Sequence, residues 1–222
     1  KSNTTWIEVP LCLLASFVVL IMANDVILDA DTANILTRSD GIILLAFFTI
    51  FTGYVFHLLN SERNDKTETR ENYSTGKAAL FLILGLILAV AGGRMIVTGA
   101  VNLARLIGVS ERIIGLTIVA LGTSLPELAA SIASVRKNNA DLAIGNVVGS
   151  NIFNSFFILG ISAIIHPVPI PEGAALDFLT NILAGLLLFI FIFTGKGRKL
   201  VWWEGLLFLI LFGRYWIWIL SG

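Results

Sequence analysis

Charged residues and cysteine are both scarce in this sequence. Only 14% of the 222 residues are Asp, Glu, Lys or Arg, whereas a soluble domain carries about 25%. Apolar residues make up 56%, and the mean hydropathy is +0.88. The formal net charge is zero, so nothing favours nucleic-acid binding. Cys12 is the one cysteine, which excludes an intrachain disulfide. This composition indicates an integral membrane protein.

Long apolar runs, in contrast, recur along the whole chain. A helix needs about 20 mostly apolar residues to cross a bilayer. Runs of suitable length cover 6–23, 41–59, 77–97, 113–135, 142–165, 178–194 and 201–220. We therefore predict an all-α, polytopic transmembrane protein with about seven spans. The chain begins with Lys1 and no signal peptide precedes the first span, so we expect a processed or cut chain.

The fourth run contains an unusual polar stretch, Ala-Leu-Gly-Thr-Ser-Leu-Pro-Glu at 120–127. Pro126 has no N–H to donate to the Gly122 carbonyl, so the helix should open there. Broken backbone at membrane depth is tolerated only where it is buried in protein or lines a wet cavity. A carboxylate at that depth, here Glu127, is costly and is a functional-site hypothesis by default. The stretch predicts a helix that is broken in order to bind a ligand.

The fifth run opens with a second polar stretch, Gly-Asn-Val-Val-Gly-Ser-Asn-Ile-Phe-Asn at 145–154. Side chains four residues apart share one face of a helix. Such stripes are formed by Asn146, Ser150 and Asn154 in this run and by Thr123, Glu127 and Ser131 in the fourth. Gly145 and Gly149 should allow close helix approach. We predict that the two stripes face each other at mid-bilayer around one carboxylate.

Carboxylate, hydroxyl, amide and carbonyl oxygens are hard ligands, which suit calcium or sodium rather than zinc or copper. Alternatively, these groups hydrogen-bond one helix to another, as Ser, Thr and Asn do in membranes. A third hypothesis is an intramembrane enzyme with Ser124 as nucleophile and His57 or His166 as base. Both histidines lie at span ends, whereas a nucleophile and its base must come within about 3 Å. The residues favour ion binding and no enzyme.

The motifs at 122–128 and 145–154 together resemble the α-repeat signature of the cation/calcium exchanger superfamily, in particular its sodium/calcium exchanger branch. The resemblance extends to the Gly-Gly-Arg at 92–94 and to the segment 39–43. It implies a ten-helix antiporter of two inverted five-helix repeats, with calcium and sodium as transported ions and no cofactor. Residues 1–60 would be the last two helices of the first repeat, 61–76 a cytoplasmic linker, and 77–222 the second repeat.

The resemblance also implies a set of ion ligands. Glu127 would be the central calcium ligand, and this half of the site would be completed by oxygens of Ala120, Thr123, Ser124, Ser150 and Asn154. A second motif pair, present in family members, is missing here. The chain would then supply half a site and would need the missing first-repeat helices, from the same parent chain or another copy. Proton coupling, or a non-transporting half or scaffold, are the alternatives.

Lys and Arg are distributed unevenly among the loops, and they concentrate on the side of 61–76. The positive-inside rule then places this linker in the cytoplasm and the carboxyl terminus outside, in a plasma or inner membrane. Two features stay open. Arg94, near the predicted end of the third span, is either a gate or a side chain that snorkels to the interface. The acidic loop 24–40 is either a cation-attracting vestibule or an ordinary solvated loop.

Overall fold

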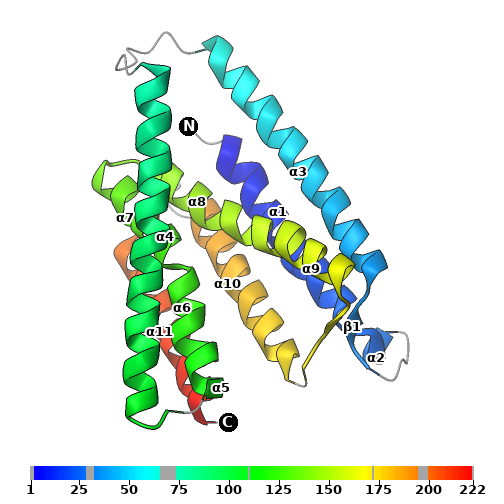
Figure 1. The fold of residues 1–222 in the computed structure, drawn as a ribbon. Helices are drawn as coiled ribbons and strands as arrows, with labels where there is room; N and C mark the ends of the chain where they lie inside the picture. Colours follow the sequence, from blue (N-terminus) through cyan, green and yellow to red (C-terminus); the bar gives the residue numbers. More distant parts are fainter. Residues whose placement is uncertain are drawn as a thin grey trace. The chain divides into compact units, whose positions relative to one another are not determined.

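The structure is a computed structural model that describes residues 3–28, 33–65, 74–109, 111–171, 173–194 and 200–221. Helices occupy all seven predicted runs (Figure 1). Four are long and apolar enough to cross a membrane, and a bent pair makes a fifth when counted as one span. The predicted all-α polytopic fold is confirmed. Strand structure in the described residues is limited to one pair of two-residue strands.

The chain forms two compact units, residues 1–66 with 144–211 and residues 67–143 with 212–222. The first unit contains α1 (Asn3–Met22), α2 (Asp25–Leu28), β1 (Ile35–Leu36), α3 (Arg38–Asp65), η2 (Phe153–Ile158), α9 (Leu159–Ile165), β2 (Val168–Pro169) and α10 (Ala174–Thr194). The second contains α4 (Thr75–Leu106), α5 (Glu111–Ile114), η1 (Gly115–Val119), α6 (Ala120–Thr123) and α7 (Leu125–Arg136). Two helices, α8 (Ala140–Ile152) and α11 (Trp202–Ser221), begin in one unit and end in the other.

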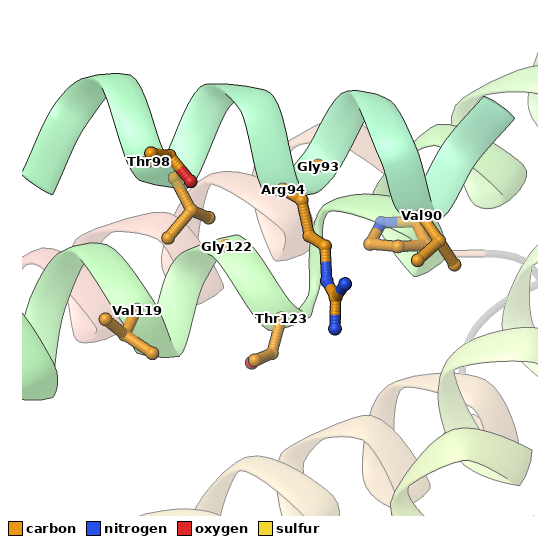
Figure 2. Close-up of a pocket in the computed structure, with 9 residues that line it drawn as sticks. Val90, Gly93, Arg94, Thr98, Val119, Gly122 and Thr123 are labelled. Carbon is orange, nitrogen blue, oxygen red and sulfur yellow. The ribbon is translucent and has the colours of Figure 1, made fainter. Parts of the chain in front are cut away.

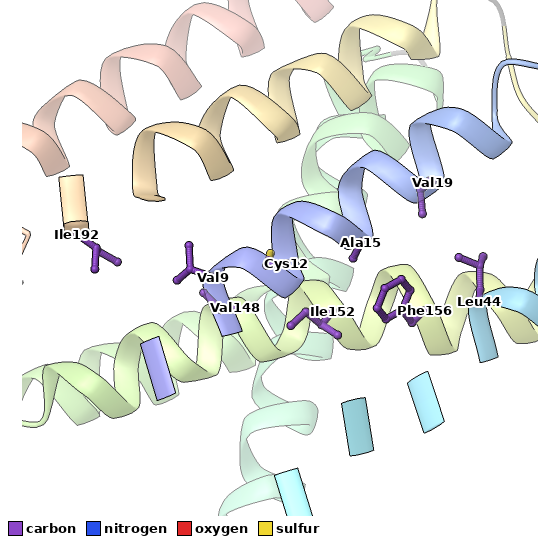
Figure 3. Close-up of a cluster of buried hydrophobic side chains, with 9 residues drawn as sticks. All are labelled: Val9, Cys12, Ala15, Val19, Leu44, Val148, Ile152, Phe156 and Ile192. Atoms are coloured by element: carbon purple, nitrogen blue, oxygen red, sulfur yellow. The ribbon is translucent and has the colours of Figure 1, made fainter. Parts of the chain in front are cut away.

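The core of the first unit is apolar and lies between α1, α3, α8 with η2, and α10 (Figure 3). Its buried side chains recur every three or four residues, which is the helical period. They are Val9, Cys12, Ala15, Val19, Leu44, Val148, Ile152, Phe156 and Ile192. Phe156 stacks on Phe47 of α3 with ring centroids 5.4 Å apart. These contacts fix which face of α8 points into the unit.

Close packing of small residues brings α3 against α9. A methyl group on Gly41 would lie 2.6 Å from the Gly160 carbonyl oxygen, so only glycine fits at this crossing. The loops at the ends of these helices meet through β1 and β2, which pair antiparallel with Ile35 opposite Pro169. The proline-rich connection 166–171 is thus extended at Val168 and Pro169, where it forms half of this small β-pair.

Two acidic side chains of the loop 24–40 stabilise the backbone. Asp25 accepts a hydrogen bond from the Ile35 N–H at 3.0 Å. Asp40 accepts from both the N–H and the hydroxyl of Thr37, and the Asp40 N–H approaches that hydroxyl, which is a capping box at the start of α3. These contacts support the ordinary structural interpretation of the loop. Asp29 and Asp31 lie outside the described residues.

In the second unit α4 packs against α6 and α7 through glycine. A methyl group on Gly122 would lie 1.9 Å from Val97 Cγ2, so α4 and α6 touch at this point without room for a side chain. Four residues earlier in α4, Gly93 faces the Gly122 carbonyl oxygen and Pro126 at ordinary contact distance. Among the glycines of α4, Gly93 is thus the one that faces the broken helix. Methyl groups on Gly85, Gly92 or Gly99 would meet none of the described atoms within 4 Å.

Two predicted boundaries differ from the structure. The third span was expected to end at residue 97, but α4 continues to Leu106. The apolar pattern is interrupted after 97 by Thr98, Asn102 and Arg105. The backbone stays helical because this segment contains no proline and helix propagation is cooperative. The start of the predicted linker, 61–65, is the last part of α3. Residues 66–73 lie outside the described residues, so the linker role stays a prediction.

Candidate functional site

The fourth span is broken where the proline predicts it. Residues Thr117–Thr123 and Leu125–Arg136 form two helical parts bent by 47° around Ser124. The Ser124 N–H is shared between the Leu121 carbonyl, 3.0 Å away, and the Gly122 carbonyl. The chain resumes as α7 when Leu128 N–H donates to the Ser124 carbonyl. Because residue 126 is proline, the Gly122 carbonyl has no N–H four residues ahead.

The predicted ligands of this span gather at the break. Thr123 is the last residue of α6 and its hydroxyl donates to the Ala120 carbonyl at 2.8 Å, so two of them already contact each other. A hydroxyl that donates its hydrogen keeps its oxygen lone pairs for a cation. Glu127 lies in the first turn of α7, half-buried, with Oε2 shielded from solvent. Ala120, Thr123, Ser124 and Glu127 therefore all lie at the break or within about one helical turn of it.

The regular stripe predicted for this span is interrupted. Thr123 belongs to α6, whereas Glu127 and Ser131 belong to α7, and the 47° bend separates the two helices. A spacing of four residues places side chains one above the other only in a continuous helix. The prediction that all three stack on one face is therefore wrong across Ser124. It holds within α7 for Glu127 and Ser131.

Each motif lies next to a π-helical segment, which the sequence did not suggest. In η1, immediately before the Ala120–Thr123 turn, the buried Thr117 donates its hydroxyl to the Ile113 carbonyl at 2.5 Å. In η2, Asn154 is the second residue. Single π turns occur mostly inside α-helices and are frequent at functional sites. Both motif-bearing spans thus depart from α-helical geometry beside their polar residues.

The polar residues of the fifth span lie opposite its buried face. Val148, Ile152 and Phe156 are almost completely buried in the first unit. Ser150 is two residues from the first two of these, which corresponds to about 200° around a helix of 3.6 residues per turn. Ser150 is accordingly half-buried, its hydroxyl donating to the Val147 carbonyl, and Asn154 is exposed. The stripe therefore points away from the core of its own unit.

The two stripes belong to different compact units. Glu127 and its neighbours lie in the second unit, and Ser150 and Asn154 lie in the first. Their approach across the membrane stays a prediction. A methyl group on Gly149 would meet none of the described atoms within 4 Å, while one on Gly145 would lie 3.6 Å from Glu8 Oε2 of α1.

Glu8 is a polar residue of the first unit that was not among the predicted ligands. It is a half-buried carboxylate inside α1, directly over Gly145 of α8. Its position inside the apolar run 6–23 was the available signal, because carboxylates are rare in spans. Across the described residues, no group of three or more His, Cys, Asp or Glu side chains could hold a metal ion. A cation site within this part of the chain would therefore combine a single carboxylate with hydroxyl, amide and carbonyl oxygens.

The proline-broken span, its carboxylate and the second polar stripe all lie in a region that matches a known family. The family model described as "Sodium/calcium exchanger protein" matches residues 77–221, which is more than half of the chain. The chain belongs to this family. The resemblance identified from the two motifs is therefore confirmed, and the family is one of ion exchangers rather than enzymes.

Individual relatives and solved structures agree with this assignment. The chain is 39% identical to CaxA of Alkalimonas amylolytica and 37% identical to the inner membrane protein YrbG of Escherichia coli, each over 81% of this chain. It covers 59% and 56% of those proteins, so it spans little more than half their length. The structure of the sodium/calcium exchanger from Methanococcus jannaschii matches with 26% identity and a TM-score of 0.74, over 100% of this chain and 65% of that one.

Proposed function

We propose that the chain is part of a secondary active antiporter that exchanges sodium for calcium, with its ion site at the break between α6 and α7. The observation that carries the proposal is the 47° bend at Ser124, with half-buried Glu127 in the turn that follows it. A backbone break and a carboxylate are both costly in a membrane unless they serve binding. The family of the chain and the exchangers among its relatives support the same function.

Each proposed ligand has a chemical role. Glu127 supplies the negative charge that a divalent cation requires. Thr123, Ser124 and the Ala120 carbonyl supply neutral oxygens, which suit sodium as well as calcium. Ser150 and Asn154 supply a hydroxyl and an amide from the other polar stripe. The set holds only hard oxygen ligands, which matches alkali and alkaline-earth cations rather than zinc or copper.

We infer that this chain supplies half of the calcium site. Calcium prefers 6–8 oxygens. Two oxygens of Glu127, one each of Ser150 and Asn154, and one or two carbonyls at the break give about five or six when the hydroxyls of Thr123 and Ser124 are assigned to sodium. One carboxylate also leaves the doubly charged ion partly uncompensated in a region of low dielectric, which is unfavourable. The missing oxygens and charge would come from an equivalent motif on another segment, in the same parent chain or in a second copy.

The experiment is calcium-45 uptake into vesicles loaded with sodium, using the full-length protein that carries this chain. Glu127→Gln keeps the side-chain volume and removes the charge, so uptake should fall to that of empty vesicles. Asp141→Asn is the matched control, because this exposed carboxylate at the start of α8 lies outside the proposed site and uptake should be preserved. Calcium uptake retained by Glu127→Gln would refute the assignment.

The same vesicles distinguish the alternatives. Residues 1–222 reconstituted alone should not exchange sodium for calcium. Robust uptake by this chain would contradict the half-site hypothesis, unless two copies are shown to pair in opposite orientations. Replacing the sodium gradient by a proton gradient tests proton coupling. If only the proton gradient drives calcium uptake, the coupled ion is the proton and not sodium.

The proposed orientation has its own test. We propose that the linker 61–76 is cytoplasmic and the carboxyl terminus external, in a plasma or inner membrane. The excess of Lys and Arg on the linker side supports this orientation. A cysteine at Thr67 should react with an impermeant maleimide only from the cytoplasmic side, and one at Pro169 only from outside. The reverse pattern would overturn the orientation.

A further inference from the structure

Arg94 lies far from either end of its helix. Helix α4 runs from Thr75 to Leu106, so 12 residues follow Arg94, and they correspond to about 18 Å of helix at 1.5 Å per residue. The 19 residues before it correspond to about 28 Å. The whole helix is about 48 Å long, which exceeds a hydrocarbon layer of about 30 Å, and about three further turns of helix follow Arg94. Snorkelling of Arg94 to the interface therefore stays a prediction.

The exposed side chain of Arg94 lines a cavity beside the broken helix. This cavity, about 570 Å³ in volume, lies within the second unit between α4 and the α6–α7 break. Its lining is formed by Val90, Gly93, Arg94, Val97, Thr98, Val119, Gly122, Thr123 and Pro126. Figure 2 shows the guanidinium extending from α4 toward the end of α6, beside Thr123. The one charged residue of the lining thus shares a cavity with a proposed ion ligand.

The packing of α4 holds Arg94 at this place. The preceding residue, Gly93, contacts the break directly, with Pro126 Cδ and the Gly122 carbonyl oxygen within 4 Å of where its methyl group would be. Val97, one turn later, fills the space over Gly122. Because these contacts leave α4 little freedom to move away from α6, the backbone of Arg94 is fixed beside the break. The cavity lining contains no carboxylate that could neutralise the guanidinium.

A positive charge at this position affects any cation that binds at the break. Arginine stays protonated in proteins, so its charge is permanent. The repulsion between two charges scales with their product, and a calcium ion therefore experiences twice the repulsion of a sodium ion at the same place. At about 10 Å and an effective dielectric of about 20, the repulsion lowers the affinity for a monovalent ion on the order of tenfold, and that for a divalent ion by about the square of that factor.

We propose that Arg94 is a selectivity-determining residue, a tethered positive charge that weakens calcium binding at the break more than sodium binding. The proposal rests on the proposed function, since it requires that cations bind at the α6–α7 break. An antiporter must release calcium as well as capture it. A fixed positive charge near the site limits the calcium affinity and so favours release of the ion.

The test is binding of calcium-45 and sodium-22 to the purified full-length protein in detergent. Arg94→Gln should tighten both affinities, with a calcium factor close to the square of the sodium factor. Arg94→Lys keeps the charge and should leave both affinities near those of the unsubstituted protein. Met95→Gln is the matched control for a new amide on α4, because Met95 is exposed and lies outside the cavity lining. It should change neither affinity.

A second variant covers the case in which Arg94→Gln does not fold. Thr98→Lys adds a positive charge to the same cavity and should weaken calcium binding more than sodium binding. If Arg94→Gln leaves both affinities unchanged, or shifts them by equal factors, the proposal is overturned while the cation site stands. The proposed function fails, and this inference with it, if the unsubstituted protein binds neither ion. The same holds if the Glu127→Gln variant binds calcium with the affinity of the unsubstituted protein.

Discussion

The two spans that carry the polar motifs depart from regular helical geometry in different ways. The span at 111–136 breaks at Ser124 and changes direction by 47°. The span at 140–165 stays continuous over 26 residues and absorbs its irregularity in the π segment η2. A break exposes backbone carbonyls, whereas a π turn keeps the ladder and shifts the side chains that follow. The first span is therefore suited to offer backbone oxygens, and the second to offer side chains.

The packing of the two spans differs in the same sense. The continuous span buries large side chains, with Phe156 and Ile152 in the core of the first unit. The broken span instead meets α4 through Gly122, where even a methyl group has no room. Large side chains hold a helix by many dispersion contacts, while glycine lets two backbones approach. The motif at 145–154 is therefore held by large buried side chains, whereas the motif at 120–127 is held by close backbone contact at a glycine. Three substitutions test this difference.

The largest effect is expected from Phe156→Ala in the continuous span. Phe156 is 1% exposed and stacks on Phe47, so its loss should leave a cavity and cost about 3 kcal/mol of unfolding free energy. Thermal unfolding in detergent, followed by tryptophan fluorescence, measures the change. Phe153→Ala is the control from the same π segment, because Phe153 is 40% exposed and should cost clearly less. Equal losses for both variants would contradict the view that the core holds this span.

A smaller loss is expected from Gly122→Ala in the broken span. The new methyl group would lie 1.9 Å from Val97 Cγ2, and overpacking of this kind costs about 1–3 kcal/mol. Valine is stiff in a helix and cannot rotate away cheaply. The double variant with Val97→Ala should recover most of the stability. Gly99→Ala in α4 is the control, because a methyl group there would meet none of the described atoms within 4 Å. This substitution should be neutral or slightly stabilising.

The smallest effect, limited to ion affinity, is expected from Pro126→Ala. It restores an N–H for the Gly122 carbonyl, and a hydrogen bond of about 1 kcal/mol should weaken the apparent sodium and calcium affinities about fivefold. The protein should remain folded, since the change removes only two ring carbons of a half-buried residue. Pro10→Ala in α1 is the control, because it makes the same chemical change away from the proposed site. Unchanged affinities in Pro126→Ala would mean that the break is not part of the ion site.

Much of this architecture could be predicted from the sequence. Each of the seven apolar runs contains a helix, and within the described residues four of these helices, or five with the bent pair, are long and apolar enough to cross a bilayer. Pro126 located the break because its missing N–H acts locally and needs no tertiary information. The family followed from two motifs in which Glu127 and Asn154 stand at fixed spacings, and residues 77–221 match the family.

Other features depend on packing that the sequence does not display. Nothing in the residues of η1 or η2 distinguishes a π turn from an α turn, because the extra residue is accommodated by neighbouring helices. The end of α4 at Leu106 was missed because polar residues after 97 resemble an interface. That error hid the roughly three helical turns that follow Arg94. The pairing of Ile35 with Pro169 joins loops more than 130 positions apart, which local patterns cannot indicate.

The π segment η2 also lies between two parts of one span, α8 and α9, whose packing faces must point in particular directions. Before it, α8 must direct Val148 and Ile152 into the core, which leaves Ser150 facing outward. After it, α9 must turn Gly160 toward Gly41, where no side chain fits. A wider turn contains one residue more than an α turn, so it resets the rotational phase between these two contacts. Deleting one residue from η2 would rotate α9 by about 100° relative to α8, so the span could satisfy its core or its crossing with α3, but not both.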